Sequence, residues 1–369
     1  MLKKLKEKLA TTTVLALEKM NFSKKSLIKI SKNLPIFATA LIATNVVGLN
    51  EAEATDGAAA TTEIAQTETT ATSVVAGLLE SNATAVVTYT ISGTSTLGAL
   101  GGKDAIGVTE DSNTEILTIT QTGASVATLA GDVEIGSGSA DVINYLQTGA
   151  GTTLVQGNLV HNNAANVTHI ILGVASASTS HVLTIDNAAD EDQTWSKVDT
   201  IKGADASDTI TVNITSSLAG AADNTTTIGG VFGGAGNAAI DALNIGSTDN
   251  QTVIAKFDGT ALTATAITLG NTGATADAIT FSVDTLTSAD LTVTGAINAA
   301  NATDNVTLAI AGDDANTITF ASDIGTGIAG TIDTVTVGAQ DDNVDVNATF
   351  NGSLVAGAIT IGNTNTSNA

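Results

Sequence analysis

The sequence predicts an all-β protein made of stacked strand repeats, a β-solenoid, with tandem β-sandwich domains as the alternative. Two observations support this prediction. Apolar and polar residues alternate with a period of two in many short segments, such as VVTYTISG from Val86, which is the pattern of half-buried strands. In addition, the phrase FDGTALTATAITLGNT, which begins at Phe257, returns as FNGSLVAGAITIGNT at Phe350.

The composition favours strands and tight turns around a narrow interior. Aromatic residues make up 3% of the chain, and there are 36 Gly and no Cys. The core must therefore consist mainly of small aliphatic side chains, and no disulfide can stabilise it. The abundant Thr, Val and Ile favour strands, whereas Gly, Asn and Asp favour turns.

Residues 1–54 are predicted to be a secretory signal peptide. A basic segment is followed by an apolar run from Leu34 to Leu49 and by the small-residue pattern AEA, which ends at Ala54. The sequence leaves open whether translation starts at Met1, giving an extended signal, or at Met20. We therefore expect a protein that is secreted and displayed at the cell surface, without membrane insertion of the mature chain.

The charge of the chain limits its partners. The sequence contains 37 acidic residues against 13 Lys and has no Arg, for a formal net charge of −24. Removal of the signal leaves four Lys against 33 acidic residues, a difference of −29. Such a surface repels nucleic acid and anionic membranes, because both are recognised through Lys and Arg. It either attracts divalent cations or simply keeps the protein soluble.

Three regions are expected after the signal. Residues 55–80 are a low-complexity leader, residues 81–230 an irregular β-repeat region, and residues 231–369 a regular one with a period of about 24 residues. One such unit cannot bury its own apolar face, but stacked units can cover one another. A Phe is expected to fill each layer. The period is taken from apolar-x-apolar-Gly patterns that end at Gly246, Gly270, Gly295, Gly338 and Gly362.

Turns rich in Gly and Asp, such as GADASDTI from Gly203 and GAQDDNVDV from Gly338, are candidate calcium sites. Hard divalent cations require several carboxylate and carbonyl oxygens, and such turns supply both. The tandem nonapeptide period of known calcium repeats is missing, so solvated turn residues are the competing interpretation. The candidate calcium ligands are Asp205, Asp208, Asp313, Asp314, Asp341 and Asp342.

The sequence does not predict an enzyme. His161, His169 and His181 have no metal-binding spacing, and no nucleotide-binding motif is present. Sugar hydrolysis would require paired carboxylates in a cleft, and four Lys without Arg could hardly bind an anionic sugar. No catalytic residue and no cofactor other than calcium are therefore expected.

After residue 80 the chain resembles bacterial surface-layer proteins and the passenger regions of large autotransporter surface antigens of the rickettsial type. The resemblance rests on phrases such as VDTIKGADASDTITVNI and LTVTGAINAANATDNVTLAI, on high acidity and on the absence of Cys. It implies a secreted structural protein that self-assembles into a surface layer or filament. The alternative is an adhesin passenger region that binds a cell-surface ligand. Autotransporters end in a membrane-anchoring domain, which the terminal GNTNTSNA does not resemble.

Overall fold

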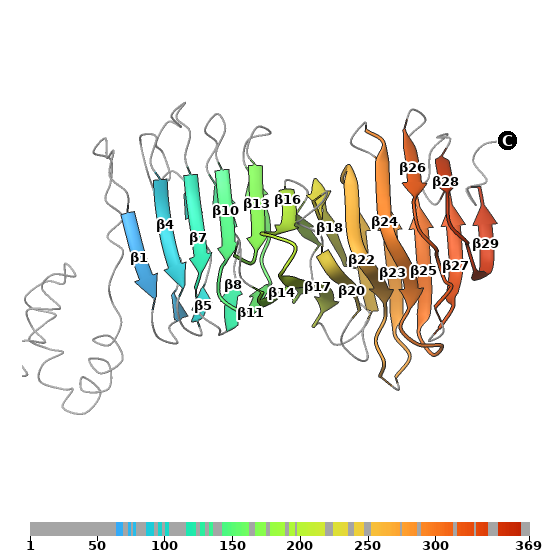
Figure 1. The fold of residues 1–369 in the computed structure, drawn as a ribbon, viewed down its shortest axis with the longest axis horizontal. Coiled ribbons are helices and arrows are strands. Elements are labelled where there is room, and N and C mark those ends of the chain that lie inside the picture. Colours follow the sequence, from blue (N-terminus) through green and yellow to red (C-terminus); the bar gives the residue numbers. More distant parts are fainter. Residues whose placement is uncertain are drawn as a thin grey trace, which may run out of the picture. The chain divides into compact units, whose positions relative to one another are not determined.

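A computed structural model shows parallel β-strands stacked as a solenoid (Figure 1). The predicted β-solenoid is thereby confirmed over the tandem sandwich. The described residues belong to the second of the chain's two units, Ala54–Ala369. Within this described part, no helix is long and apolar enough to cross a membrane. The description covers residues 64–68, 73–74, 77–78, 86–91, 95–97, 100–102, 116–122, 126–129, 133–135, 142–161, 167–174, 178–188, 192–195, 198–217, 224–234, 240–246, 252–273, 275–285, 289–312, 316–327, 330–338 and 346–362.

The first ladder of in-register parallel strands runs through the whole stack. It shares β22 and β24 with the second ladder, and the two form one 18-stranded sheet. Its strands are β1 (Ile64–Glu68), β4 (Val86–Ile91), β7 (Ile116–Gln121), β10 (Val142–Gln147), β13 (Val167–Leu172), β16 (Val198–Gly203), β19 (Val231–Phe232), the first part of β22 (Ala261–Leu269), the first part of β24 (Leu291–Ala299), β26 (Thr317–Phe320) and β28 (Asn347–Phe350).

The second ladder follows the first around each coil. It continues through the second parts of β22 and β24 and ends in single bridges at Ile324 and Leu354. Its other strands are β2 (Ser73–Val74), β5 (Ser95–Leu97), β8 (Val126–Leu129), β11 (Gly151–Val155), β14 (Ser180–Asn187), β17 (Thr209–Ser216) and β20 (Ile240–Ile245).

The third ladder closes each coil. It consists of a four-stranded and a seven-stranded sheet. The first contains β3 (Gly77–Leu78), β6 (Leu100–Gly102), β9 (Val133–Ile135) and β12 (Leu159–His161). The second contains β15 (Gln193–Trp195), β18 (Thr225–Ile228), β21 (Thr252–Phe257), β23 (Ala278–Val283), β25 (Asn305–Ile310), β27 (Ile332–Val337) and β29 (Ala356–Ile361).

The stack begins earlier than the sequence predicted. β1, β2 and β3 lie inside the segment assigned to a low-complexity leader, residues 55–80, and β1 pairs with β4 in parallel register. The predicted signal peptide, residues 1–54, lies outside the described residues and stays a prediction.

The predicted 24-residue period holds at some steps of the stack and not at others. Gly246 stacks on Gly270, because a Cβ at Gly246 would lie 3.6 Å from the Gly270 Cα. The next position in that column is Ala300, whose amide donates to the Leu269 carbonyl as the Gly270 amide donates to that of Ile245. In-register partners are 24 residues apart at Ile240 and Ala264 but 31 apart at Ala261 and Thr292. Strand pairing sets the register, and the turns absorb differences in length.

The glycines of the predicted series therefore lie at different positions around the coil. Gly270 follows the second-ladder part of β22, and Gly362 follows β29 of the third ladder. Gly295 lies within β24 with a φ of 123°, where a Cβ would approach the Ala264 carbonyl oxygen to 2.2 Å.

The two copies of the repeated phrase also occupy different corners. The first copy starts at Phe257, the end of β21 on the third ladder, and runs through β22. The second starts at Phe350, the end of β28 on the first ladder, and runs through β29 on the third. The phrase therefore encodes a strand–corner–strand segment rather than one complete coil.

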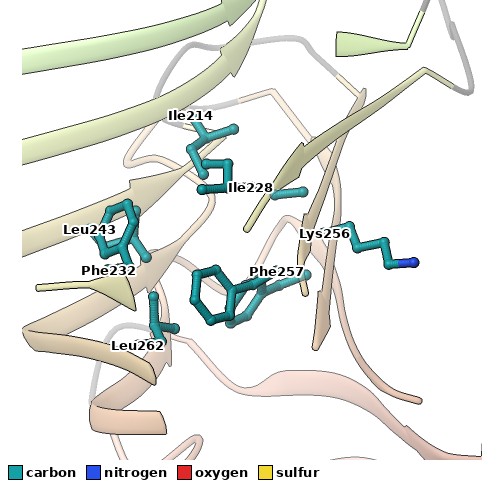
Figure 2. A pocket seen from close by; sticks show the side chains of 9 residues that line it. Ile214, Ile228, Phe232, Leu243, Lys256, Phe257 and Leu262 are labelled. Carbon is teal, nitrogen blue, oxygen red and sulfur yellow. The ribbon is translucent and has the colours of Figure 1, made fainter. Parts of the chain in front are cut away.

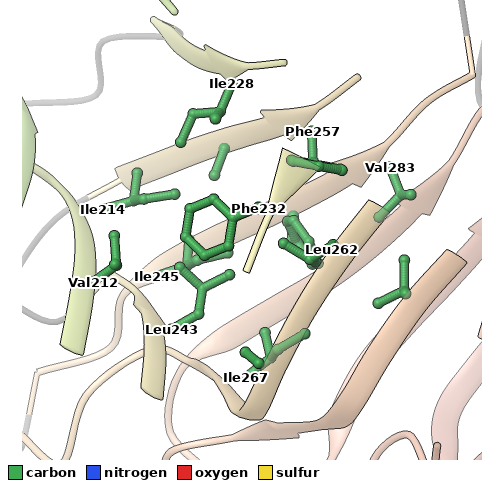
Figure 3. Packing of buried hydrophobic residues seen from close by; sticks show 14 of the residues in the cluster. Val212, Ile214, Ile228, Phe232, Leu243, Ile245, Phe257, Leu262, Ile267 and Val283 are labelled. Carbon is green, nitrogen blue, oxygen red and sulfur yellow. The ribbon is translucent and has the colours of Figure 1, made fainter. Parts of the chain in front are cut away.

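The core lies between the three ladders and is formed by alternate residues of each strand. Phe281, Leu308 and Val335 are in register on successive strands of the third ladder, and each is at most 2% exposed. Phe232 of the first ladder meets Phe257 of the third edge to face, with ring centroids 6.3 Å apart (Figure 3). Each coil thus covers the apolar face of its neighbours, as the sequence predicted.

Candidate functional site

Of the six predicted calcium ligands, the structure describes Asp205 and Asp208, which lie in the turn between β16 and β17. Asp313, Asp314, Asp341 and Asp342 lie outside the described residues. Among the residues that are described, no group of three or more His, Asp or Glu side chains is arranged to hold a metal ion. Calcium binding at these turns stays a prediction.

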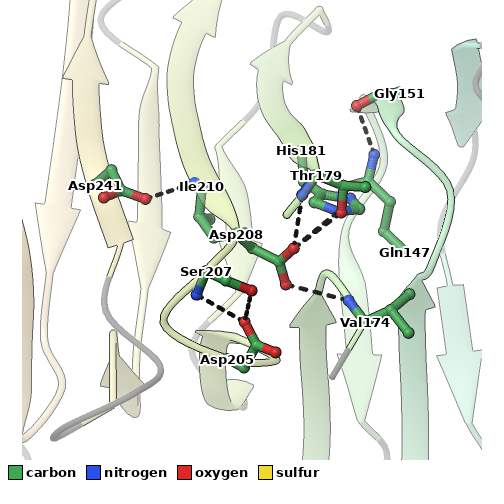
Figure 4. A network of polar contacts seen from close by, with 10 residues as sticks. All are labelled: Gln147, Gly151, Val174, Thr179, His181, Asp205, Ser207, Asp208, Ile210 and Asp241. Atoms are coloured by element: carbon green, nitrogen blue, oxygen red, sulfur yellow. Dashed lines mark hydrogen bonds and ion pairs between the residues drawn. The ribbon is translucent and has the colours of Figure 1, made fainter. Parts of the chain in front are cut away.

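The Asp208 carboxylate holds the loop of the preceding coil. Its Oδ2 accepts a hydrogen bond of 3.2 Å from the Val174 amide, and its Oδ1 accepts one of 3.1 Å from the Thr179 amide (Figure 4). These two amides stand at the beginning and end of the loop between β13 and β14. Asp208 is 6% exposed, so the loop gains two charge-assisted hydrogen bonds in a buried setting. We call this arrangement an inter-coil clamp.

A second clamp has nearly the same geometry. Asp304 Oδ2 accepts a hydrogen bond of 3.2 Å from the Asn271 amide, and Oδ1 accepts one of 3.1 Å from the Asp277 amide. The loop that it closes joins β22 to β23, at a different corner of the coil from the Asp208 clamp. The clamp is therefore a device that the fold uses more than once.

The local sequence explains how the carboxylate of each clamping aspartate is positioned. The clamping residue ends the tetrapeptide DASD at residues 205–208 and NATD at residues 301–304. Asp205 Oδ1 accepts from the amide and hydroxyl of Ser207 at 2.7 and 2.6 Å. Asn301 Oδ1 accepts from the same groups of Thr303 at 2.7 and 2.9 Å. This side-chain turn fixes the backbone just before the carboxylate that clamps the neighbouring coil.

Each clamp also requires a glycine in the neighbouring coil. Gly173 and Gly270 directly precede the first clamped amide and have φ values of 107° and 87°, a region that L residues rarely adopt. A Cβ at Gly173 would lie 2.0 Å from Asp208 Oδ2, and one at Gly270 would lie 2.1 Å from Asp304 Oδ2. Both conformation and space therefore exclude a side chain at these positions.

His181 packs against the first clamp. Its Nε2 lies 2.5 Å from the Thr179 hydroxyl oxygen and 3.9 Å from Asp208 Oδ1. The Thr179 hydroxyl donates a 2.9 Å hydrogen bond to the same carboxylate oxygen. Burial lowers the pKa of His181 below its ordinary value of 6.5, although the Asp208 charge opposes this shift. The ring is therefore neutral at pH 7. His181 and Thr179 together support the Asp208 carboxylate that forms the clamp.

Other aspartates satisfy backbone amides at the starts of strands. Asp241 at the start of β20 accepts a 2.7 Å hydrogen bond from the Ile210 amide of the preceding coil, and Asp333 in β27 accepts one of 2.8 Å from Val306. In three further pairs the aspartate lies in the earlier coil and accepts a 2.8 Å hydrogen bond from an amide of the next coil. These pairs are Asp192 with Thr225, Asp290 with Thr317 and Asp323 with Ser353. These acidic residues serve the protein's own backbone, a role that the sequence analysis missed.

An ion pair lies at one corner of the third ladder. Lys256 Nζ is 2.8 Å from Asp284 Oδ2, and the Asp284 side chain is fully buried. Asp258 directly follows β21, and Asp284 directly follows the neighbouring strand β23. Because Phe257 and Val283 are in-register partners, the two aspartates occupy adjacent positions on neighbouring coils. Burial raises the pKa of Asp258 above its ordinary value of 3.8; Lys256 opposes this rise, and Asp284 adds to it.

A cavity lies in the core beside this corner (Figure 2). Its volume is about 10 Å³, and apolar side chains including Phe232, Phe257 and Phe281 line it. Figure 2 shows the Lys256 amine pointing away from it. Such a space is at the lower limit for one water molecule, which would need polar partners. The cavity is a packing defect rather than a ligand site.

Comparisons of the chain with protein-family models, with curated proteins and with solved structures gave no match. Function must therefore be inferred from the geometry described above.

We expect Gly173→Ala to lower the free energy of unfolding by about 3 kcal/mol or more, because it adds the loss of clamp hydrogen bonds to backbone strain. The matched control is Gly362→Ala, which has a similar φ of 105° and no atom within 4 Å of the new Cβ. Urea unfolding measures both. In an Asp208→Ala background the cost of Gly173→Ala should fall to the strain alone; equal costs in both backgrounds would show that no clamp is present.

We expect Lys256→Met to destabilise the protein by about 3–5 kcal/mol, because it leaves the buried Asp284 carboxylate without a cation. Adding Asp284→Asn should restore most of that loss. Lys202→Met on β16 is the control for removal of a lysine. Thermal unfolding at neutral pH measures all four proteins. If Lys256→Met costs no more than Lys202→Met, the ion pair does not stabilise the fold.

We expect the Asp258 carboxylate to weaken the fold as the pH rises. Because its folded pKa is raised, the folded state binds more protons than the unfolded state between pH 3.8 and that raised pKa. Stability is thus lost as the pH rises through this window, and Asp258→Asn removes the loss. The Asn variant should melt at a higher temperature at pH 7 and at the same temperature below pH 3.8. A lower melting temperature at pH 7 would contradict the account.

Proposed function

We propose that the chain is a secreted structural protein of the cell surface, a subunit that assembles into a layer or filament. The observation that carries this proposal is the use of aspartate side chains to join neighbouring coils, as in the two clamps. A stack whose polar groups are engaged in holding its own backbone is suited to bear load. The resemblance to surface-layer proteins points to the same class.

The outer faces of the coils suit lateral packing between copies. Strands of the third ladder place Thr280, Thr307 and Thr334 in one in-register row. Strands of the second ladder place Ala242, Ala266 and Ala296 in another. Short uncharged side chains in regular rows make flat surfaces, and flat surfaces can lie against one another over many coils.

Calcium has a place in this proposal as a bridge between copies. Copies with a mature charge near −29 repel one another unless cations neutralise their carboxylates. Asp313, Asp314, Asp341 and Asp342 form two closely spaced pairs of carboxylates in the sequence. Carboxylates from two copies could together supply the oxygen ligands that calcium requires.

An adhesin passenger region is the second candidate function. The rows of Thr and Asn on the second ladder favour it, because Asn213, Asn244 and Thr268 present hydrogen-bonding groups in register. Part of this capacity is used internally, since Asn244 Nδ2 donates a 3.0 Å hydrogen bond to Asn213 Oδ1. A monomeric rod that binds a surface ligand would fit this candidate.

Electron microscopy of the purified protein with calcium, and then with a chelator, tests the proposal. We expect sheets or filaments that dissolve on chelation. Sodium chloride at matched ionic strength is the control, because it screens charge without bridging carboxylates. A variant with Asn at positions 313, 314, 341 and 342 should lose the calcium response. Dispersed rods under every condition would overturn the assembly proposal and favour the adhesin.

A further inference from the structure

The Asp284 carboxylate is buried at a corner of the third ladder with few groups to stabilise its charge. Its side chain has no exposure to solvent, and Lys256 Nζ lies 2.8 Å from its Oδ2. Apart from that contact, no described residue donates a hydrogen bond to either of its oxygens. An ionised carboxylate can accept about four hydrogen bonds, so a buried one with a single partner is costly. The pair is therefore held together at a site that disfavours both charges.

The strand register holds the two groups in contact. Lys256 is in register with Ser282 of the next coil, and Asp284 follows two residues later. The Asp284 amide donates a 2.9 Å hydrogen bond to the Phe257 carbonyl, which fixes its backbone beside the end of the lysine's strand. The lysine side chain is only 19% exposed, so most of it is packed against the protein. Groups held in this way can react without the entropy cost of first being brought together.

The next coil excludes water from the Asp284 carboxyl group. Because Val283 and Ile310 are in-register partners, the position adjacent to Asp284 on that coil is Ala311, which is 1% exposed. A methyl group offers the carboxylate neither a hydrogen-bond donor nor a charge. Loss of hydration favours the neutral forms of the pair, an amine and a carboxylic acid. The neutral amine is the nucleophilic form of lysine.

Asp258 is placed to carry protons between the two groups. It occupies the position adjacent to Asp284 on the preceding coil. Burial raises the pKa of Asp258 above its ordinary value of 3.8; Lys256 opposes this rise, and the Asp284 charge adds to it. Neighbouring carboxylates retain a proton at a higher pH than a single one would. Asp258 can therefore hold a proton beside the Asp284 carboxyl group.

We propose that Lys256 and Asp284 form an isopeptide bond between neighbouring coils, with Asp258 as the proton carrier. Asp258 gives its proton to the Asp284 carboxylate and takes one from the Lys256 ammonium. The neutral amine attacks Asp284 Cγ, and a nitrogen–carbon bond forms. One carbon–oxygen bond of the carboxyl group then breaks, and that oxygen leaves as water with two protons, both of which come from the ammonium. Asp258 ends in the protonation state in which it started.

The product removes the cost of burying the ion pair. An amide carries no net charge, so the bond replaces two ions at a buried corner with one neutral group. It also closes a loop from residue 256 to residue 284 and constrains the unfolded chain, as a disulfide would; this chain has no Cys. The bond lies within a single chain and does not depend on the proposed assembly. Protein in which it has not formed retains the ion pair described above.

The intact mass of the purified full chain tests the bond, because its formation removes one water, about 18 Da. Lys256→Arg keeps the positive charge and removes the nucleophilic amine. We expect the parent to be lighter by one water than its sequence requires, and Lys256→Arg to have the full mass of its sequence. Lys202→Arg on β16 is the matched control and should retain the deficit. A parent of full mass, or a deficit that persists in Lys256→Arg, would overturn the proposal.

Trypsin digestion of the unfolded protein locates the bond. Trypsin cleaves after a lysine with a free amine and not after one whose nitrogen is acylated. Linked protein should therefore resist cleavage after Lys256 and be cleaved after Lys202. A cyclic imide at Asp258 and Gly259 would also remove one water, but it would leave Lys256 cleavable and so refute the isopeptide bond.

Asp258→Ala tests the proton carrier. It should leave most of the protein at full mass, because the ammonium of Lys256 then lacks a group to which it can pass its protons. An Asp258→Ala protein that is linked as fully as the parent would overturn the role assigned to Asp258.

Discussion

The hydrogen-bonded register between neighbouring coils is the constraint on which the rest of this structure depends. A strand that slips by one residue would turn its apolar side chains outward, so each pairing fixes which residues enter the core. Register also creates the columns along the stack, such as Phe281, Leu308 and Val335. Because each coil covers its neighbours, stability is shared between adjacent coils rather than held in one globular core.

The same register explains the structural role of the acidic residues. A parallel stack turns a corner several times per coil, and each corner leaves backbone amides without strand partners. A carboxylate accepts hydrogen bonds without donating any, so Asp is well suited to these amides. Asp208 and Asp304 do this across whole loops, and Asp241 and Asp333 do it at single strand starts. An excess of acid over base is thus compatible with a stable chain at these corners, because the backbone amides solvate the carboxylates that they contact.

The sequence was sufficient to predict the class of fold, but it did not predict the number of residues in each coil. Period-two alternation and the repeated phrase predicted a strand stack, and the structure confirms a solenoid. The 24-residue period was not general, because turns of different length change the spacing without disturbing strand pairing. The predicted turn aspartates could not be assigned either. DASD at residues 205–208 is equally typical of a solvated turn, a calcium site and a clamp, and its partners lie 29 to 34 residues earlier. Both clamps could have been found from one signal: a tetrapeptide of Asp or Asn, then Ala, then Ser or Thr, then Asp, directly before a strand.

The register itself is open to a direct measurement, because the chain has no Cys of its own. Thr307 and Thr334 are in-register neighbours 27 residues apart on the third ladder. Thr307 and Thr331 are 24 residues apart, as the spacing in the sequence alone would require. Each pair is replaced by cysteines, and the two proteins are oxidised under the same conditions. The structure predicts an intramolecular disulfide in the 307/334 protein and free thiols in the 307/331 protein, because neighbouring strands bring in-register Cα atoms within disulfide reach. A disulfide at 307/331, or at neither pair, would contradict the stacking described here.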